Sequence, residues 1–263
     1  MSFQLSGSAP EIYENTMVPL WFGRWAKALL ELVSLKPGER ILDVACGTGV
    51  TTRFAKKEVG ADGEVIGLDI NAGMLSAARE LSTELDIVWM ESDVVNVALP
   101  SHHFDAIICQ HGYHYFPDQP AALKEFHRLL KPSGRIAISI WDGHSAYTQS
   151  LCSAVEKFIS PEVAVKQRSQ RETPTARALE AGATQAGFSN VSVIRQELVI
   201  SVPLAAEFVP LHLGSMPIAP AFLNLSDNEK KALVADVAHS LEGYVVGDQL
   251  VYPDAVNVIT GIK

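Results

Sequence analysis

The sequence predicts an α/β protein with a doubly wound, seven-stranded and mostly parallel sheet whose last strand is antiparallel, plus a helical cap or lid. Two observations support this prediction. Short apolar runs of strand type alternate with helical segments over residues 40–141, and a glycine-rich turn follows the first of these runs. Because each connection between parallel strands lays a helix across the sheet, this alternation favours helices on both faces.

A helix is expected before the first strand, because Val18 to Val33 place apolar side chains at helical spacing. Strand Arg40 to Ala45, a glycine turn and helix Val50 to Glu58 follow. Further strands are expected at Glu64 to Ile70, Asp86 to Glu91, Phe104 to Gln110 and Arg135 to Trp141, with helices from Asn71 to about Thr83 and from about Pro120 to Leu130. Asn71 is a candidate N-cap, and residues 131–134 (KPSG) are expected to close the last of these helices.

The alternation loosens beyond Trp141. We expect helices at Ala146 to Ile159 and Thr175 to Ala186, a polar stretch between them at 161–173, and strands at Asn190 to Val202 and within Leu250 to Ile262. The segment Pro203 to Tyr244 is far longer than a hairpin loop and carries a helical stretch near residues 227–241. It is therefore expected to fold as a cap over one end of the sheet.

Composition limits the class of protein. A chain of 263 residues with 48% hydrophobic content can bury one large core, so one domain is expected. A net charge of -9 disfavours nucleic acid as a partner. The three cysteines form no C-x-x-C pair, which favours reduced thiols and a cytoplasmic protein. We expect neither a secretion signal nor a membrane span.

The strongest motif, Ile41 to Gly49 (ILDVACGTG), lies at the carboxyl end of the first strand. Its small residues let a ligand approach the backbone, and the next helix presents free N–H groups, so a nucleotide-type ligand is expected. The alternative is the dinucleotide fingerprint G-x-G-x-x-G of an NAD-dependent oxidoreductase. The third glycine is replaced by Thr52, and Asp43 lies inside the strand, so this alternative is disfavoured.

Asp43-x-x-Cys46-Gly47-Thr48-Gly49 resembles the first motif of the class I S-adenosylmethionine-dependent methyltransferases. The resemblance is to the small-molecule branch, which includes the ubiquinone and menaquinone biosynthesis C-methyltransferases and many natural-product enzymes, and it covers residues 10–145. It implies one methyltransferase domain over 1–263, with lid helices at 1–35 and a cap insertion at 203–245. The implied cofactor is S-adenosyl-L-methionine, with S-adenosyl-L-homocysteine as its product.

The resemblance assigns cofactor contacts to the N-terminal segment and to residues at the ends of the first four strands. They are Tyr13, Asp43, Ala45, Gly47, Gly49, Asp69, Ile70, Met74, Asp93, Val94 and Gln110. Asp69 ends the second strand, where its carboxylate can accept hydrogen bonds from ribose hydroxyls; helix capping is the structural alternative. Met74 is expected either against adenine or in the core, and Asp93 with the Val94 N–H is expected at the purine edge.

The segment after the fourth strand (QHGYHYFPD) is where we expect catalysis, because ligands bind outside the carboxyl ends of strands in open α/β sheets. His111 and His114 are the candidate bases for a phenol or enol, since histidine titrates near working pH. The structural alternative is that each is a packed or solvated side chain. A metal held by Cys109, His111 and His114 is disfavoured, because no familiar zinc spacing is present.

Aromatic and methionine residues indicate which parts of the chain form the acceptor site. Tyr13, Met17 and Trp21 share one helical face, which fits either a core-facing stripe or, by the resemblance, a lid with Tyr13 near the cofactor carboxylate. Apolar residues of the cap are expected to shape the acceptor site. The candidate substrate contacts are Trp21, Tyr115, Phe208, His212 and Met216.

These features together predict methylation of a small, aromatic or hydrophobic metabolite on oxygen or nitrogen. A quinone or polyene C-methyltransferase is one alternative, and a non-catalytic regulator that binds S-adenosylmethionine is another. The expected partner is a small-molecule acceptor, and a homodimer stays open as an assembly state.

Overall fold

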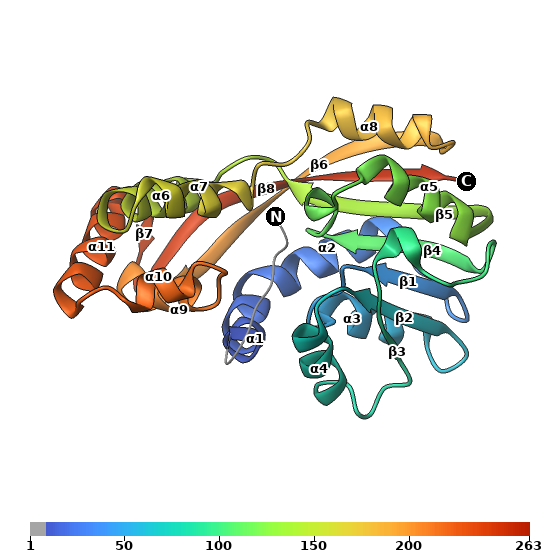
Figure 1. The fold of residues 1–263 in the computed structure, drawn as a ribbon, viewed down its shortest axis with the longest axis horizontal. Coiled ribbons are helices and arrows are strands. Elements are labelled where there is room, and N and C mark those ends of the chain that lie inside the picture. Colours follow the sequence, from blue (N-terminus) through green and yellow to red (C-terminus); the bar gives the residue numbers. More distant parts are fainter. Residues whose placement is uncertain (1–8) are drawn as a thin grey trace.

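The computed structural model describes residues 9–263, with side chains from residue 11 onward. Its sheet has the strand order β3-β2-β1-β4-β5-β8-β6, with β7 beside β8 (Figure 1). The strands are β1 (Arg40–Val44), β2 (Glu64–Asp69), β3 (Val88–Glu91), β4 (Phe104–Gln110), β5 (Leu130–Trp141), β6 (Ser189–Pro203), β7 (Val245–Val246) and β8 (Gln249–Ile262). Neighbours from β3 to β5 are parallel, whereas β8 is antiparallel to β5 and β6. The seven-stranded prediction with an antiparallel last strand is confirmed, and β7 is an additional short strand.

Helices cover both faces of the sheet, as the alternation of elements predicts. Those of the first face and edge are α2 (Gly23–Val33), α3 (Val50–Val59) and α4 (Ala72–Glu80), and those of the other face are α5 (Gln119–Leu129) and α8 (Ala176–Gln185). Adjacent residues of β1 point to opposite sides: Ile41 packs in one core with Trp25 of α2, and Leu42 packs in another with Phe126 of α5. Asn71 caps α4 as predicted, because its side chain accepts a hydrogen bond from the Met74 N–H (3.1 Å).

Two boundaries differ from the sequence prediction. Residues 131–134 do not form a loop that closes α5; β5 begins at Leu130, because this residue pairs with Phe104 of β4. The N-terminal helix begins before Val18, with α1 (Ala9–Ile12) and the π-helix η1 (Tyr13–Phe22) leading into α2. Residues 1–8 of the predicted lid lie outside the described part of the chain.

The cap forms one end of the molecule, where the long strands β6 and β8 extend beyond the rest of the sheet (Figure 1). Its helices are α6 (Ala146–Phe158), α7 (Pro161–Ser169), α9 (Ala205–Gly214), α10 (Ala219–Leu223), α11 (Asp227–Ser240) and the short η4 (Glu242–Tyr244). The predicted insertion at 203–245 therefore forms only part of the cap. The stretch expected only to be polar contains α7, which Ser160 caps and which buries Ala164 and Gln167.

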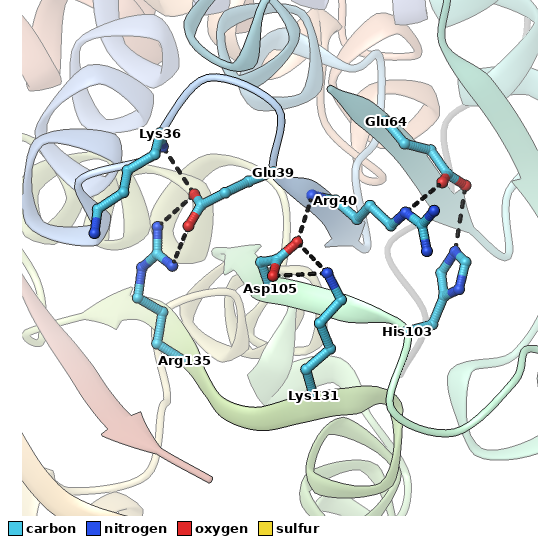
Figure 2. Close-up of polar contacts among 8 residues, drawn as sticks. All are labelled: Lys36, Glu39, Arg40, Glu64, His103, Asp105, Lys131 and Arg135. Carbon is cyan, nitrogen blue, oxygen red and sulfur yellow. Dashed lines mark hydrogen bonds and ion pairs between the residues drawn. The ribbon is translucent and has the colours of Figure 1, made fainter. Parts of the chain in front are cut away.

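Charged residues join the amino ends of four strands (Figure 2). Glu39 accepts two hydrogen bonds from Arg135 of β5 (2.8 and 2.7 Å). Asp105 accepts from the Arg40 N–H (2.8 Å) and from Lys131 (2.7 Å). These contacts lie at the edge of the sheet opposite the carboxyl ends of its parallel strands, so their role is structural. No helix among the described residues has the length and apolar character needed to cross a membrane.

Candidate active site

A cavity of about 420 Å³ opens at the carboxyl ends of the parallel strands. Its walls come from the segments after β1, β2, β3, β4 and β5, and from η1 and the cap. Of the predicted cofactor residues, ten line this cavity: Tyr13, Asp43, Ala45, Gly47, Asp69, Ile70, Met74, Asp93, Val94 and Gln110. The carboxyl ends of the parallel strands lie at the same edge of the sheet, which brings together residues that are far apart in the sequence.

Gly49 is the predicted cofactor residue that is not in the cavity wall. It is the N-cap residue of α3, with φ +81°, and a Cβ atom at this position would lie 2.2 Å from the Trp89 ring. Gly49 therefore allows Trp89 to pack against the turn. Gly47, with φ +57°, lies in the wall, and its N–H donates to Asp69 (2.8 Å).

Three aspartates define the cofactor end of the cavity. Burial raises the pKa of Asp43 to about 7, despite the hydrogen bond that it accepts from the Thr52 hydroxyl (2.6 Å). Its other oxygen, Oδ1, is buried and has no partner among the described residues. Burial also raises the pKa of Asp69, which accepts from the N–H groups of Gly47 and Asn71 (both 2.8 Å).

Asp93 follows β3 and caps the short helix η2 (Val94–Asn96) by accepting from the Val95 N–H (3.1 Å). One of its oxygens makes this contact, so the carboxylate keeps further acceptor capacity in the cavity wall. Met74, for which adenine contact and core packing were both open, is buried and also lines the cavity. Its Cε would lie 3.3 Å from a Cβ atom at Gly47, so the glycine keeps the two elements close.

The N-terminal segment forms a roof over this end. Tyr13, Trp21 and Phe22 line the cavity, while Met17 is fully buried in the core. Glu14 joins the roof to the glycine turn by accepting from the Thr48 hydroxyl (2.6 Å) and by pairing with Arg53 of α3.

A second contact of the roof comes from the sheet. The Gln110 side chain donates to the Phe22 carbonyl (2.9 Å) and accepts from the Thr51 hydroxyl. The predicted cofactor residue Gln110 therefore also links η1 to β4. Glu14 could not be singled out from the sequence, because its partners lie more than thirty residues away.

The two candidate bases differ in surroundings. His111 follows β4 with φ +54°, and its ring stacks on Trp141 at a centroid distance of 3.8 Å and an interplanar angle of 4°. Burial, with contributions from His114 and Arg171, holds the pKa of His111 well below its usual value. Burial lowers the pKa of His114 to about 4, although a contact with the Gln170 backbone opposes this shift. Both imidazoles are therefore neutral near pH 7.

Four of the five predicted substrate residues line the cavity: Trp21, Tyr115, His212 and Met216. Phe208 does not reach it, because it is fully buried behind Trp21 and Tyr147 (centroid distances 6.3 and 5.2 Å). It supports the wall from behind. Among the lining residues that the sequence prediction missed are Trp141, His144, Gln167, Gln170 and Arg171. The described residues contain no group of three or more side chains suited to a metal ion.

The fold and this cavity define a Rossmann-like protein with a site for a nucleoside-containing cofactor. Residues 41–134 match the family described as "Methyltransferase domain". The chain is 37% identical over 147 residues to the 2-phytyl-1,4-naphtoquinone methyltransferase of Synechococcus elongatus, a match that covers 53% of this chain and 62% of that protein. It is 31% identical over 186 residues to the demethylmenaquinone methyltransferase of Listeria monocytogenes, covering 65% of this chain and 78% of that relative.

Among solved structures, the chain resembles the Haemonchus contortus phosphoethanolamine N-methyltransferase 2 in complex with phosphomonomethylethanolamine and S-adenosylhomocysteine, with a TM-score of 0.59. The identity is 21%, and the match covers 91% of this chain and 52% of that chain. The chain thus spans less than two thirds of the length of the Synechococcus and Haemonchus proteins. The chain belongs to the class I S-adenosylmethionine-dependent methyltransferase family, as its first motif predicted, and its curated relatives are of the quinone-biosynthesis type. The cofactor of this family is S-adenosylmethionine.

Proposed function

We propose that this protein transfers a methyl group from S-adenosylmethionine to a carbon or oxygen atom of a small, hydroxylated or quinol-type aromatic acceptor. The observation that carries the proposal is the chemical difference between the two sides of one cavity. Asp43, Asp69 and Asp93 come from β1, β2 and the segment after β3, whereas most of the aromatic and histidine side chains come from the segments after β4 and β5 and from the cap, at the other side of the sheet.

The residues of the first side fit the cofactor. The buried, unpartnered Oδ1 of Asp43 is an acceptor that needs a donor or a positive charge, and the cofactor carries both an ammonium group and a sulfonium group. Asp69 and Asp93 have acceptor capacity for hydroxyl and amine donors. When bound, the cofactor supplies an electrophilic methyl group on its sulfonium. The chain's part is to align the acceptor and to exclude water, which can supply much of the rate enhancement.

The acceptor end favours a neutral or anionic acceptor. None of the described residues that line it is an acid, because the lining aspartates are Asp43 within β1, Asp69 at the end of β2 and Asp93 after β3. A protonated amine there would lose its water without gaining a counter-charge. The sequence analysis predicted methylation on oxygen or nitrogen. The acceptor end disfavours the second of these where the nitrogen belongs to a charged amine.

The histidines suit a hydroxyl-bearing ring. A neutral imidazole can accept a hydrogen bond from an acceptor O–H, which orients the ring and increases its electron density. The low pKa values of His111 and His114 make both residues weak bases at neutral pH, so we assign them to orientation of the acceptor hydroxyl. The quinone methyltransferases among the relatives support carbon as the methylated atom.

Calorimetry with S-adenosylhomocysteine tests the cofactor site. We expect binding that Asp69→Ala weakens at least about tenfold, which corresponds to about 1.4 kcal/mol and is less than a lost charged hydrogen bond contributes. Asp62→Ala, an exposed acid on the turn before β2, is the matched control and should bind normally. Preference for NADH, or equal binding by Asp69→Ala, would overturn the assignment.

A turnover assay with methyl-labelled S-adenosylmethionine tests the acceptor class. We expect transfer to demethylated naphthoquinols or to phenols and none to alkylamines. Binding of the cofactor without transfer to any of these acceptors would favour the alternative, a non-catalytic S-adenosylmethionine-binding protein.

A further inference from the structure

One cationic side chain, Arg171, stands among the residues that line the acceptor end of the cavity. It lies in the connection between α7 and α8 and is 6% exposed. An arginine is rarely buried to this degree without a partner, because removing its charge from water is costly.

The partner is Asp254 of β8, which is itself 4% exposed. The two planar groups meet in a two-pronged pair, with Nη1 2.9 Å from Oδ1 and Nη2 2.6 Å from Oδ2. Asp254 also accepts a hydrogen bond from Nε1 of Trp21 in η1 (3.1 Å) and from the Ala255 N–H (2.9 Å). One buried carboxylate thus joins β8, the roof helix and the segment after α7.

The guanidinium group of Arg171 lies against Trp141, with its Cζ 3.9 Å from the ring centroid. The imidazole of His111 lies 3.8 Å from the centroid of the same ring and is parallel to it within 4°. Two planar groups cannot occupy one face of an indole at such distances. Trp141 is therefore layered between Arg171 and His111.

Stacking on Trp141 is the main restraint on the orientation of the His111 ring. Its Nδ1 makes one long contact with the Ser139 hydroxyl (3.5 Å), and its Nε2 has no partner among the described residues. Trp25 and Phe22 contact the ring edge-on, at centroid distances of 6.5 and 6.0 Å. The orientation of the imidazole consequently depends on how firmly Trp141 is held.

We propose that Arg171 and Asp254 are positioning residues of the acceptor site, which clamp Trp141 flat against the His111 imidazole and fix Trp21 of the roof to the same carboxylate. The inference rests on the proposed function, because it assigns a purpose to the site where the acceptor would bind. The ionisable groups that act on the His111 ring are His114 from η3 (Tyr113–Tyr115) and Arg171, which lies on the other side of Trp141 with Asp254 beyond it. Removing Arg171 therefore removes both the stacking partner of Trp141 and a nearby positive charge.

The test is an NMR titration of the histidine side chains, in which His111→Asn identifies the His111 signals. In the unaltered protein, burial is expected to hold the pKa of the His111 ring well below the usual histidine range. In the Arg171→Met variant we expect the His111 signals to shift and the midpoint of the His111 titration to move up by about 1 pH unit. Arg171→Lys keeps the charge without the planar pair, so its titration should stay low while its ring-current shift changes. Arg177→Met, an exposed arginine on α8, is the matched control and should leave His111 unchanged.

Arg171→Met leaves Asp254 without its cation, so a double variant with Asp254→Asn removes both charges and guards against loss of folding. If both variants bind S-adenosylhomocysteine and show His111 signals like those of the unaltered protein, the proposal is wrong. Loss of folding in both variants would also overturn it, because the pair would then stabilise the whole fold. For methyl transfer, we expect kcat to fall at least about tenfold while KM for S-adenosylmethionine is unchanged. The titration needs no acceptor, so a failed turnover assay would contradict the proposed function, whereas the titration tests separately whether Arg171 and Asp254 position the His111 ring.

Discussion

Ala45 and His111 both have positive φ values, 56° and 54°, and each directly follows a strand that ends at the cavity. Residues other than glycine adopt this conformation at a cost, and such strain is common at ligand sites. At Ala45 the turn brings the backbone against Gly112, where a Cβ atom would lie 2.3 Å from that of Ala45. The two segments that would contact cofactor and acceptor are thus packed backbone against backbone.

Gly49 and Gly38 test what the glycine turn requires. Both have left-handed φ values, +81° and +82°, but a Cβ atom would meet Trp89 at 2.2 Å from Gly49 and nothing within 4 Å from Gly38. We expect Gly38→Ala to lower the free energy of unfolding by about 1 kcal/mol and Gly49→Ala by about 2 to 4 kcal/mol, because crowding adds to backbone strain. Urea denaturation measures both. Trp89→Leu should recover part of the loss in Gly49→Ala, and equal losses in the two single variants would contradict this account.

At the scale of elements, Glu14 is the contact that keeps η1 on the glycine turn. Its carboxylate is partly buried and bonds both Thr48 and Arg53. We expect Glu14→Gln to cost about 1 to 2 kcal/mol locally, which corresponds to roughly tenfold faster amide hydrogen exchange across residues 13–22. Glu11→Gln changes an exposed acid one helical turn earlier and should leave the exchange as it is. Unchanged exchange in Glu14→Gln would show that apolar packing alone holds the roof.

The ion pairs at the amino ends of the strands give a pH dependence (Figure 2). Burial raises the pKa of Glu39, but hydrogen bonds from Arg135 and the Lys36 N–H outweigh it, so the pKa is below its usual value. A lowered pKa in the folded state means that this stabilisation is present above about pH 4.5 and is lost as the pH falls through the folded value. We expect Glu39→Gln to lower the free energy of unfolding by about 1 to 2 kcal/mol at pH 7 and by nothing at pH 2.

The matched control for Glu39 is Glu197→Gln, which removes a half-exposed carboxylate beside Arg195. It should change stability by less than about 0.5 kcal/mol, because water screens an exposed pair. Thermal melts of both variants at the two pH values provide the measurement. A loss for Glu39→Gln that persisted at pH 2 would show that the side chain acts through packing.

At the scale of the whole molecule, the cap and the sheet share one core. Sheet residues such as Ile41 and Ala106 belong to the same apolar cluster as Phe208 and Leu233 of the cap, and β6 and β8 run through both parts. We therefore expect a single unfolding transition, with equal calorimetric and van't Hoff enthalpies of about 180 kcal/mol near 60 °C. Two separate transitions in scanning calorimetry would show that the cap folds as a unit of its own.

Much of the fold could be predicted because its signals are local. The strands from Arg40 to Trp141 appear as apolar runs with turns between them, and the cap helix near residues 227–241 has its own start signal in Ser226. The helix α7 was missed because its single buried stripe is short and the segment is polar overall. The helical face of Tyr13, Met17 and Trp21 was predicted, but not that η1 is a π-helix, because π-helical spacing has no distinct sequence pattern.

The sequence by itself determined the order of the elements, the glycine turn and the carboxylates that follow the first strands, since each depends on neighbours in the chain. Only the tertiary structure decided that Gly49 faces Trp89, that Phe208 lies behind the wall, and that Arg171 meets Asp254 across 83 positions. The physical reason is that burial and pairing of a charged side chain depend on elements that folding brings together. A single arginine in a polar stretch looks the same in sequence whether it faces water or clamps an aromatic ring.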